Sequence, residues 1–368
     1  MRFDRIAALA AVGVVSVVSA GPAKAASDAS SSAAVANQAV ASVAAPVAAA
    51  QTAGLIGGAV GGAVGGAVGG SVGGAVGGGS VGGGFSAGGG AGGPVSKLFN
   101  TRDAGKSGGG MPAKLGLWGQ GTWVNIRKTE TALGMDGNVI NTVFGADYKF
   151  TDRVLGGLAF GYENIDITTK FNSGTYKADG YTLAPYLGVS LSPNWTADLS
   201  GGYTWLTYDV SRTSGAVKGS FDGGRWFGAT NLTGSYAIDR WRLSPKVGVL
   251  YLREMQNAYN DTGTSTARNA AQGINFGRAS GGLKTGYAFD GFTPFVKLTG
   301  EWDFTKPKAV LKSNNQMSSV DNGGGVAGLG VDFGGAGPWS GTVEGSYNSI
   351  GRTSLDVWQG TAKVRYQF

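Results

Sequence analysis

Hydrophobic and polar residues alternate with a period of two over most of the chain after Pro112. Between Ile140 and Phe150, every even position is uncharged, whereas the odd positions include Asp147 and Lys149. This periodicity is typical of a β-strand, whose side chains point alternately to two faces. It predicts about twelve strands, within 115–126, 140–150, 154–162, 181–191, 195–205, 226–238, 241–251, 283–289, 292–302, 329–333, 339–347 and 358–368.

The two faces of these strands differ in charge. The apolar face carries no charged residue, and aromatic residues such as Trp195, Trp241, Trp205 and Trp302 gather at the strand ends. Aromatic girdles around an apolar band are typical of a barrel in a bilayer. The opposite face is expected to line a hydrated lumen, with carboxylates such as Asp198 and Glu301 paired to Lys and Arg; its predicted charges are Asp198, Arg242, Lys246, Lys284, Lys297, Glu301, Glu344, Lys363 and Arg365.

The connections between strands alternate in length. Tight links at 151–153, 192–194, 239–240, 290–291 and 335–338 alternate with longer polar segments near 127–138, 163–177, 209–224, 252–277, 303–324 and 348–355. Short turns at one rim and long loops at the other predict an all-β fold, an up-and-down antiparallel transmembrane barrel. In an outer membrane the rim of short turns faces the periplasm.

Two segments precede this predicted barrel at 113–368. Residues 1–25 contain Arg2 and Arg5, an apolar run and Ala23-Lys24-Ala25, which predicts a signal peptide cleaved after Ala25. Residues 26–112 form an Ala/Ser/Gly-rich arm, with glycine at 21 of the 37 positions from Gly57 to Gly93. We expect a disordered linker, because small side chains offer little apolar area to offset backbone entropy. A weak helix around Ala33–Ala50 and a stacked β-structure for the glycine repeat are the alternatives.

Composition narrows the chemistry. The chain has no cysteine and no histidine, so thiolate sites and the commonest general base are missing. We expect no enzymatic activity, no catalytic residues, no metal and no cofactor, although a Ser-Lys dyad is chemically conceivable. The net charge of +7 comes from scattered residues and does not indicate nucleic acid. Gly105-Lys106-Ser107 resembles the end of a phosphate-binding loop, but Asn100 replaces its first glycine.

The last strand carries the strongest family resemblance. Trp358–Phe368 ends in a terminal aromatic with alternate hydrophobic residues before it, and Val364, Tyr366 and Phe368 resemble the assembly signal of bacterial outer-membrane proteins. Trp118–Trp123 resembles the first strand of the translocator domain of type V autotransporters. This resemblance implies a twelve-stranded pore that admits a linker helix and passes an upstream passenger, and an assembly signal read by the barrel-assembly machinery.

The chain departs from that family in two respects. Fewer than ninety residues separate the predicted signal peptide from the barrel, and they predict no folded passenger, so the passenger would be vestigial or very short. Glycines near Pro112 leave only Val95–Ala104 as a candidate linker helix. We therefore expect Val95–Ala113 to occupy the pore and the glycine tract to be displayed at the cell surface, the alternative being a periplasmic tether.

The function predicted from these features is an outer-membrane autotransporter-type barrel that translocates or displays its own short N-terminal segment. The alternative is a small porin or surface antigen without secretion activity. The expected partners are the outer-membrane bilayer, the barrel-assembly machinery and periplasmic chaperones, with no nucleic acid, and the barrel is expected to be monomeric. The arm is expected in the pore, in the periplasm or at the cell surface.

Overall fold

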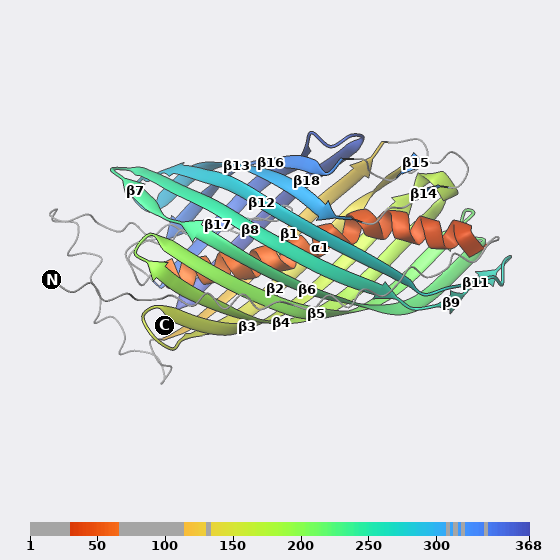
Figure 1. Ribbon diagram of the computed structural model, residues 1–368, viewed down its shortest axis with the longest axis horizontal. Coiled ribbons are helices and arrows are strands. Elements are labelled where there is room, and N and C mark those ends of the chain that lie inside the picture. Colours follow the sequence, from red (N-terminus) through yellow and green to blue (C-terminus); the bar gives the residue numbers. More distant parts are fainter. Residues whose placement is uncertain are drawn as a thin grey trace, which may run out of the picture.

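The protein is described from a computed structural model, which covers residues 30–65, 114–129, 134–306, 310–311, 316–317, 321–334 and 338–368. Twelve antiparallel strands form a closed barrel, and one long helix lies along its axis (Figure 1). The predicted fold class is therefore confirmed. The predicted signal peptide 1–25 and the segment Val95–Ala104 lie outside the described residues.

The twelve barrel strands are long and follow one another in chain order. They are β1 (Leu115–Lys128), β2 (Met135–Lys149), β3 (Val154–Thr169), β4 (Gly174–Ser192), β5 (Trp195–Arg212), β6 (Val217–Gly234), β8 (Trp241–Gln256), β12 (Gln272–Tyr287), β13 (Phe292–Thr305), β16 (Gly323–Gly334), β17 (Trp339–Ile350) and β18 (Leu355–Gln367).

Each of these strands pairs with its neighbours in sequence, and β1 pairs with β18 to close the ring. At this seam Leu117 stands opposite Tyr366, and Lys128 stands opposite Leu355. The first and last strands are in register over their full length, so the barrel has no open edge. This closure satisfies the backbone hydrogen bonds that hydrocarbon would leave unpaired.

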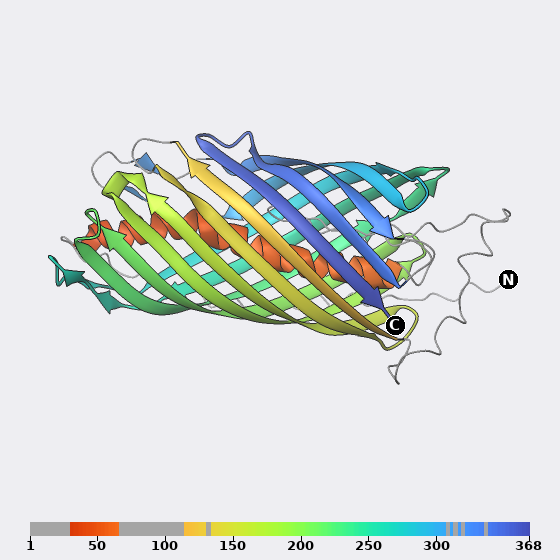
Figure 2. The ribbon, with the colours of Figure 1, turned by 180° about the vertical axis from the view of Figure 1, so that it is seen from behind.

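The two rims of the barrel differ. We call the end with both barrel termini the turn rim; it also carries the tight links, one of them beside β7 (Tyr236–Ile238) (Figures 1 and 2). We call the opposite end the loop rim; it carries η2 (Lys170–Asn172) and the short strands β9 (Tyr259–Asn260), β10 (Thr262–Gly263), β11 (Arg268–Asn269), β14 (Val310–Leu311) and β15 (Gln316–Met317).

Strands extend farther toward the loop rim than their sequence pattern indicates. The segments 163–177 and 209–224, predicted as polar loops, are mostly strand, and only 170–173 and 213–216 separate β3 from β4 and β5 from β6. Polar residues on the outer face mask the alternation there, although the strands continue to pair. The wall is highest at β4–β6 and lower at β16–β18, whose strands have 12 or 13 residues.

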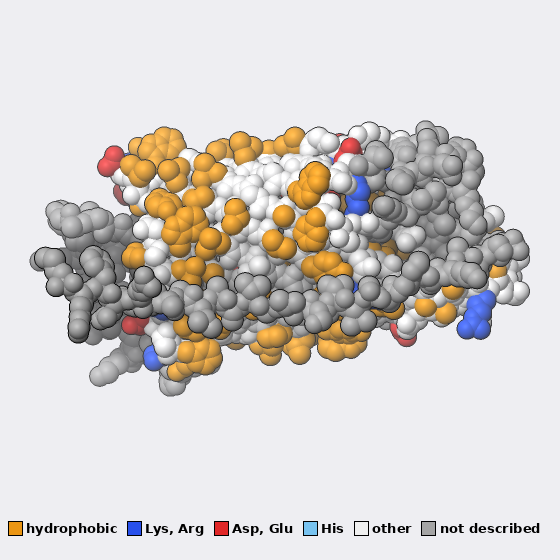
Figure 3. All heavy atoms as spheres, viewed as in Figure 1, with side chains coloured by type: hydrophobic (Ala, Val, Ile, Leu, Met, Phe, Trp, Pro, Cys, Tyr) orange, Lys and Arg blue, Asp and Glu red, His pale blue; other side chains and the backbone are white. Residues whose placement is uncertain are grey.

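The outer face of the barrel is the predicted apolar band. Leu298 is 64% exposed and Leu329 is 69% exposed, although the charged side chains of the same strands point inward. Aromatic side chains from both predicted girdles are also exposed, among them Phe150, Trp241, Trp339, Trp205, Trp302 and Trp358. Figure 3 shows hydrophobic side chains over the wall and charged side chains toward its two ends.

The helix α1 (Ser30–Gly65) lies inside the barrel (Figures 1 and 2). Its stretch Ala36–Gly61 has a mean hydropathy of 1.6 and is long and apolar enough to cross a membrane, by length and composition alone. The expectation of a disordered arm is wrong for these residues. Alanine is the strongest helix former, and the lumen supplies the packing surface that the arm lacks by itself.

Candidate functional site

The candidate functional site is the lumen of the barrel together with α1. Near the start of the helix, Asn37 Nδ2 donates a hydrogen bond to the hydroxyl of Tyr259 in β9, at 2.9 Å. Near its end, Lys363 Nζ in β18 donates to the carbonyl oxygen of Gly58, at 2.7 Å. The helix therefore begins at the loop rim and ends at the turn rim, running opposite to β1.

An apolar cluster holds the first half of α1. Val40, Ala41, Ala44 and Ala48 are buried against inward-facing side chains of several strands, including Ile126, Val139, Ile165, Leu206 and Ile274. The rings of Tyr208, Phe221 and Tyr259 stack in a row, with centroid separations of 4.7 and 4.5 Å. The expectation of a hydrated, charged lumen is wrong for this half, because aliphatic and aromatic residues cover the helix.

Tyr259 connects this cluster to the short strands at the loop rim. Burial raises the pKa of its phenol above the ordinary value, while the hydrogen bond from Asn37 lowers it. The side chain is therefore neutral at physiological pH and accepts the amide hydrogen of Asn37. The contact fixes one helical residue against a loop strand.

Polar contacts occupy the middle of the lumen. Asn141 Nδ2 in β2 donates to Thr52 Oγ1 on the helix, at 2.9 Å. The adjacent Gln51 is fully buried, and neither its amide nitrogen nor its oxygen has a hydrogen-bond partner among the described residues. On the wall, the guanidinium of Arg225 forms ion pairs with Glu163 and Glu254, each at 2.8 Å, and all three side chains are buried.

The half of the lumen nearest the turn rim is lined by charged groups, which we call the lumen charge ring. They are Asp147, Asp198, Lys246, Lys284, Lys297, Asp332, Glu344, Lys363 and Arg365, and all nine side chains are buried. Arg242 is also buried but turns to the rim, donating to the carbonyl of Asp239 at 2.8 Å. Glu301, the remaining member of the predicted set, lies on β13 closer to the loop rim.

The carboxylates of the wall find partners on nearby strands and turns. Lys284 pairs with Asp332 at 2.8 Å, and Lys297 pairs with Glu344. Glu301 pairs with Arg278 at 2.8 Å and with Arg352 at 3.1 Å. Asp198 instead accepts a hydrogen bond from Asn231 at 2.7 Å. Lys246 Nζ has no hydrogen-bond partner among the described residues.

The second half of α1 approaches this ring closely because its residues are small. A Cβ atom added at Gly57 would lie 3.0 Å from Asn231 Nδ2 and 3.2 Å from Asp198 Oδ1. Two of its cations, Lys363 and Arg365, donate to the backbone carbonyl oxygens of Gly58 and Ala59, at 2.7 and 3.4 Å. The lumen is thus shaped for a thin, neutral helix.

The predicted assembly signal lies at the end of β18. Val364 is exposed on the lipid face, and the rings of Tyr366 and Phe368 are 4.6 Å apart at the turn rim. The backbone N–H of Phe368 donates to the carbonyl of Leu115 at 3.2 Å, so the last residue is joined to the first strand.

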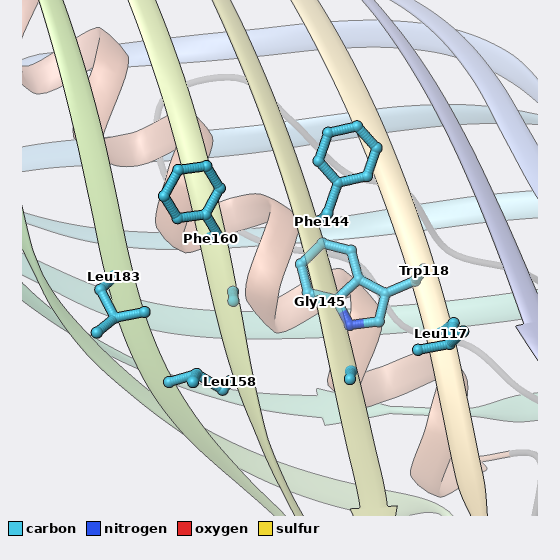
Figure 4. Close-up of a pocket in the computed structure, with 9 residues that line it drawn as sticks. Leu117, Trp118, Phe144, Gly145, Leu158, Phe160 and Leu183 are labelled. Carbon is cyan, nitrogen blue, oxygen red and sulfur yellow. The ribbon is translucent and has the colours of Figure 1, made fainter. Parts of the chain in front are cut away.

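A recess on the lipid face opens between β1 and β4 (Figure 4). Its volume is about 410 Å³, and its lining includes Leu117, Phe144, Leu158, Phe160 and Leu183. Gly145 stands in the recess, and the indole of Trp118 lies against it at a distance that leaves no room for a side chain. The recess is apolar, and no charged side chain is among its lining residues. The described part of the chain contains no group of acidic residues arranged to hold a metal ion.

Sequence reasoning missed several members of the site. Arg225, Glu163 and Glu254 fall in segments predicted as loops or at their borders, and Asp147 and Asp332 were not included among the lumen charges. The signal for α1 was available: a run of Ala, Val and Gly without any charge, interrupted by Asn37, Gln51 and Thr52.

The family model for the autotransporter β-domain matches residues 117–346 of this chain. Among solved structures, the translocator domain of the autotransporter NalP from Neisseria meningitidis is 17% identical, with a TM-score of 0.58, covering 74% of this chain and 92% of that one. The β-domain of the Bordetella autotransporter BrkA is 17% identical, with a TM-score of 0.57, covering 69% and 100%. The transport unit of AIDA-I from Escherichia coli is 13% identical, with a TM-score of 0.51, covering 74% and 96%. These likenesses concern the fold. No curated protein sequence matches the chain.

Proposed function

The chain belongs to the autotransporter β-domain family and is an outer-membrane barrel, and from this premise we propose that the barrel translocates its own N-terminal segment and retains it in the pore. In this proposal the Ser30 end of α1 is at the cell surface and the Gly65 end is in the periplasm. The observation that carries the proposal is the direction of α1, fixed by the Asn37–Tyr259 and Gly58–Lys363 contacts.

The orientation of the rims supports this direction. Short turns and both barrel termini lie in the periplasm in barrels of this kind. The start of α1 is at the opposite rim, so this orientation places Ser30 on the side of the cell surface. With cleavage after Ala25, residues 26–29 precede the helix, and the displayed segment is short.

The glycine tract has a different place in this proposal from the one expected from sequence. Gly57 to Gly65, the start of the tract, are part of α1 inside the barrel. Residues 66–113 connect Gly65 to β1, and both of these points are at the turn rim. We therefore assign this connection to the periplasmic side, in place of the surface display of the tract and the occupation of the pore by Val95–Ala113.

Export and assembly complete the proposal. The signal peptide directs the chain through the inner membrane, periplasmic chaperones protect the unfolded strands, and the barrel-assembly machinery recognises Val364, Tyr366 and Phe368. In this proposal the charges of the lumen act by pairing with each other and by holding α1. A monomeric barrel is sufficient, because the lipid face and the lumen are both complete within one chain.

Cysteine labelling tests the direction of α1, since the chain has no cysteine of its own. A membrane-impermeant maleimide should label Ser30→Cys in intact cells. Ser80→Cys, the matched control within the connection, should be labelled only after the outer membrane is permeabilised. Labelling of Ser80→Cys but not Ser30→Cys in intact cells would reverse the proposed direction.

Conductance tests the porin alternative. The full-length protein in a planar bilayer should conduct poorly, because α1 occupies the lumen. A constitutive, high conductance would favour a porin and count against a retained segment.

A further inference from the structure

The end of α1 has an internal repeat that matches the pitch of a helix. Residues 57–60 read Gly-Gly-Ala-Val, and residues 61–64 repeat the same four. A helical turn has about 3.6 residues, so a step of four residues corresponds to a shift of about 6 Å with a rotation of about 40°. A screw motion of this size places residues 61–64 where residues 57–60 stand.

The wall of the lumen contacts this unit through features that the repeat reproduces. Lys363 binds the backbone carbonyl of Gly58, and Asp198 and Asn231 approach Gly57 so closely that a Cβ atom there would meet them. These contacts favour a small residue followed by an accessible carbonyl. Gly61 and Gly62 supply the same two features one unit later.

We propose that the lumen charge ring, with Asn231, is a docking site for one Gly-Gly-Ala-Val turn of helix, and that α1 has a second docked register one unit closer to the loop rim. This inference rests on the proposed retention of α1 in the pore. In the second register four more residues are exposed beyond the loop rim, so the repeat sets the length of the displayed segment.

The rest of the helix tolerates the shift at most positions. Along the first half, alanine or valine replaces alanine or valine at several places against the apolar cluster, whereas Thr52 moves into the place of Ala48 and Gln51 into that of Val47. Leu55 moves into the place of Gln51, whose amide has no hydrogen-bond partner, so no hydrogen bond is lost there. A leucine is close in volume to glutamine and is better suited to a buried position.

Two polar contacts distinguish the registers. After the shift, Ala41 stands opposite Tyr259 where Asn37 was, and Ile56 stands opposite Asn141 where Thr52 was. Both hydrogen bonds are then lost. The fully buried Leu55 and Ile56 are also replaced, by Ala59 and Val60. Asn37 and Thr52, together with these two apolar side chains, therefore hold α1 in the observed register.

Disulfide cross-linking in isolated outer membranes tests both parts of the inference on the full-length chain. The pair Gly57→Cys with Asn231→Cys reports the observed register, and Gly61→Cys with Asn231→Cys reports the second one. Ala59→Cys with Asn231→Cys is the control, because residue 59 is on another face of the helix. Each pair is compared with and without Asn37→Ala and Thr52→Val.

We expect the 57–231 disulfide to dominate in the parent chain. The 61–231 disulfide should increase about fivefold for each hydrogen bond removed, the effect of a net contribution of about 1 kcal/mol, and the 59–231 pair should stay unlinked. Formation of only the 57–231 disulfide in every background would overturn the second register. Equal 57–231 and 61–231 linkage already in the parent chain would overturn the role of Asn37 and Thr52.

These outcomes are separable from those of the maleimide experiment, because cross-linking in isolated membranes does not depend on which side the helix end faces. Labelling of Ser30→Cys without any 61–231 disulfide would leave the proposed function in place and remove the second register alone.

Discussion

Arg365 and Asp147 form a two-pronged ion pair although a strand lies between them. The guanidinium of Arg365 on β18 donates to both carboxylate oxygens of Asp147 on β2, at 2.6 and 2.9 Å. The pair passes over Gly116 of β1, where a Cβ atom would lie 2.2 Å from the guanidinium. It therefore joins the two strands on either side of β1 at the point where the barrel closes.

Breaking this pair should destabilise the seam. We expect Arg365→Ala to lower the free energy of unfolding by about 3–5 kcal/mol, because Asp147 is left buried without its partner. The exchange of both residues, Arg365→Asp with Asp147→Arg, should recover part of this loss. Both changes are measured by incubating the barrel in increasing concentrations of urea. The fraction that remains folded is then read on SDS gels, where the folded and the heated protein form different bands. No recovery in the exchanged variant would show that the pair itself is not the stabilising feature.

The two faces of the wall should respond differently to charge. Leu187 is 42% exposed on the lipid face, and Leu187→Arg should destabilise the barrel by about 2–4 kcal/mol if the site is near the middle of the bilayer. Lys246→Arg, on the lumen face, keeps a positive charge near the buried carboxylate of Asp198 and should cost less. Unfolding in lipid vesicles compares them, and equal losses would contradict the assigned faces.

Gly145 should tolerate no larger residue while Trp118 is present. A Cβ atom at this position would be 2.4 Å from the indole ring, so Gly145→Val should reduce the yield of heat-modifiable barrel. Trp118→Ala in the same chain should restore the yield, because it clears the space. Gly360→Val on β18, where a Cβ atom meets nothing within 4 Å, is the matched control. A defect at Gly145 that persists without the indole would point to a different cause.

The terminal aromatic should matter for assembly more than for stability. Deletion of Phe368 or Phe368→Asp should leave precursor in the periplasm, whereas Phe368→Tyr should assemble normally, because the family resemblance assigns recognition to an aromatic end. Cell fractionation measures the distribution. Normal insertion of Phe368→Asp would remove this residue from the assembly signal.

Much of the barrel could be predicted because a bilayer imposes its own pattern. Leu298 and Leu329 alternate with inward-facing neighbours, and the tryptophans mark both interfaces, so strand number and facing follow from the sequence. The sequence also predicts that Lys246 and Lys363 face the lumen, because they alternate with apolar residues on the same strands. It does not predict which lumen charges pair with each other. Arg365, for example, pairs with Asp147 across an intervening strand, and no sequence spacing indicates that contact.

The helix α1 and the strand ends toward the loop rim were harder to predict from the sequence, for a different physical reason. Ala-Gly sequences have too little apolar area to fold by themselves, so local rules predict a linker until a surface that fits them is known. Toward the loop rim, Ile165 and Ile167 face inward against α1, while polar Asp166 is exposed on the outer face, so the sequence pattern there does not indicate a strand. Both errors arise from packing between segments distant in sequence.

Because β1 closes on β18 around α1, the helix is threaded through the barrel. A helix enclosed by an unbroken cylinder of hydrogen bonds can leave only lengthwise. Because α1 precedes every strand in the chain, it can be in place before the last strand pairs with the first. The order of events in folding, rather than the strength of any contact, would then determine that α1 lies inside the closed barrel.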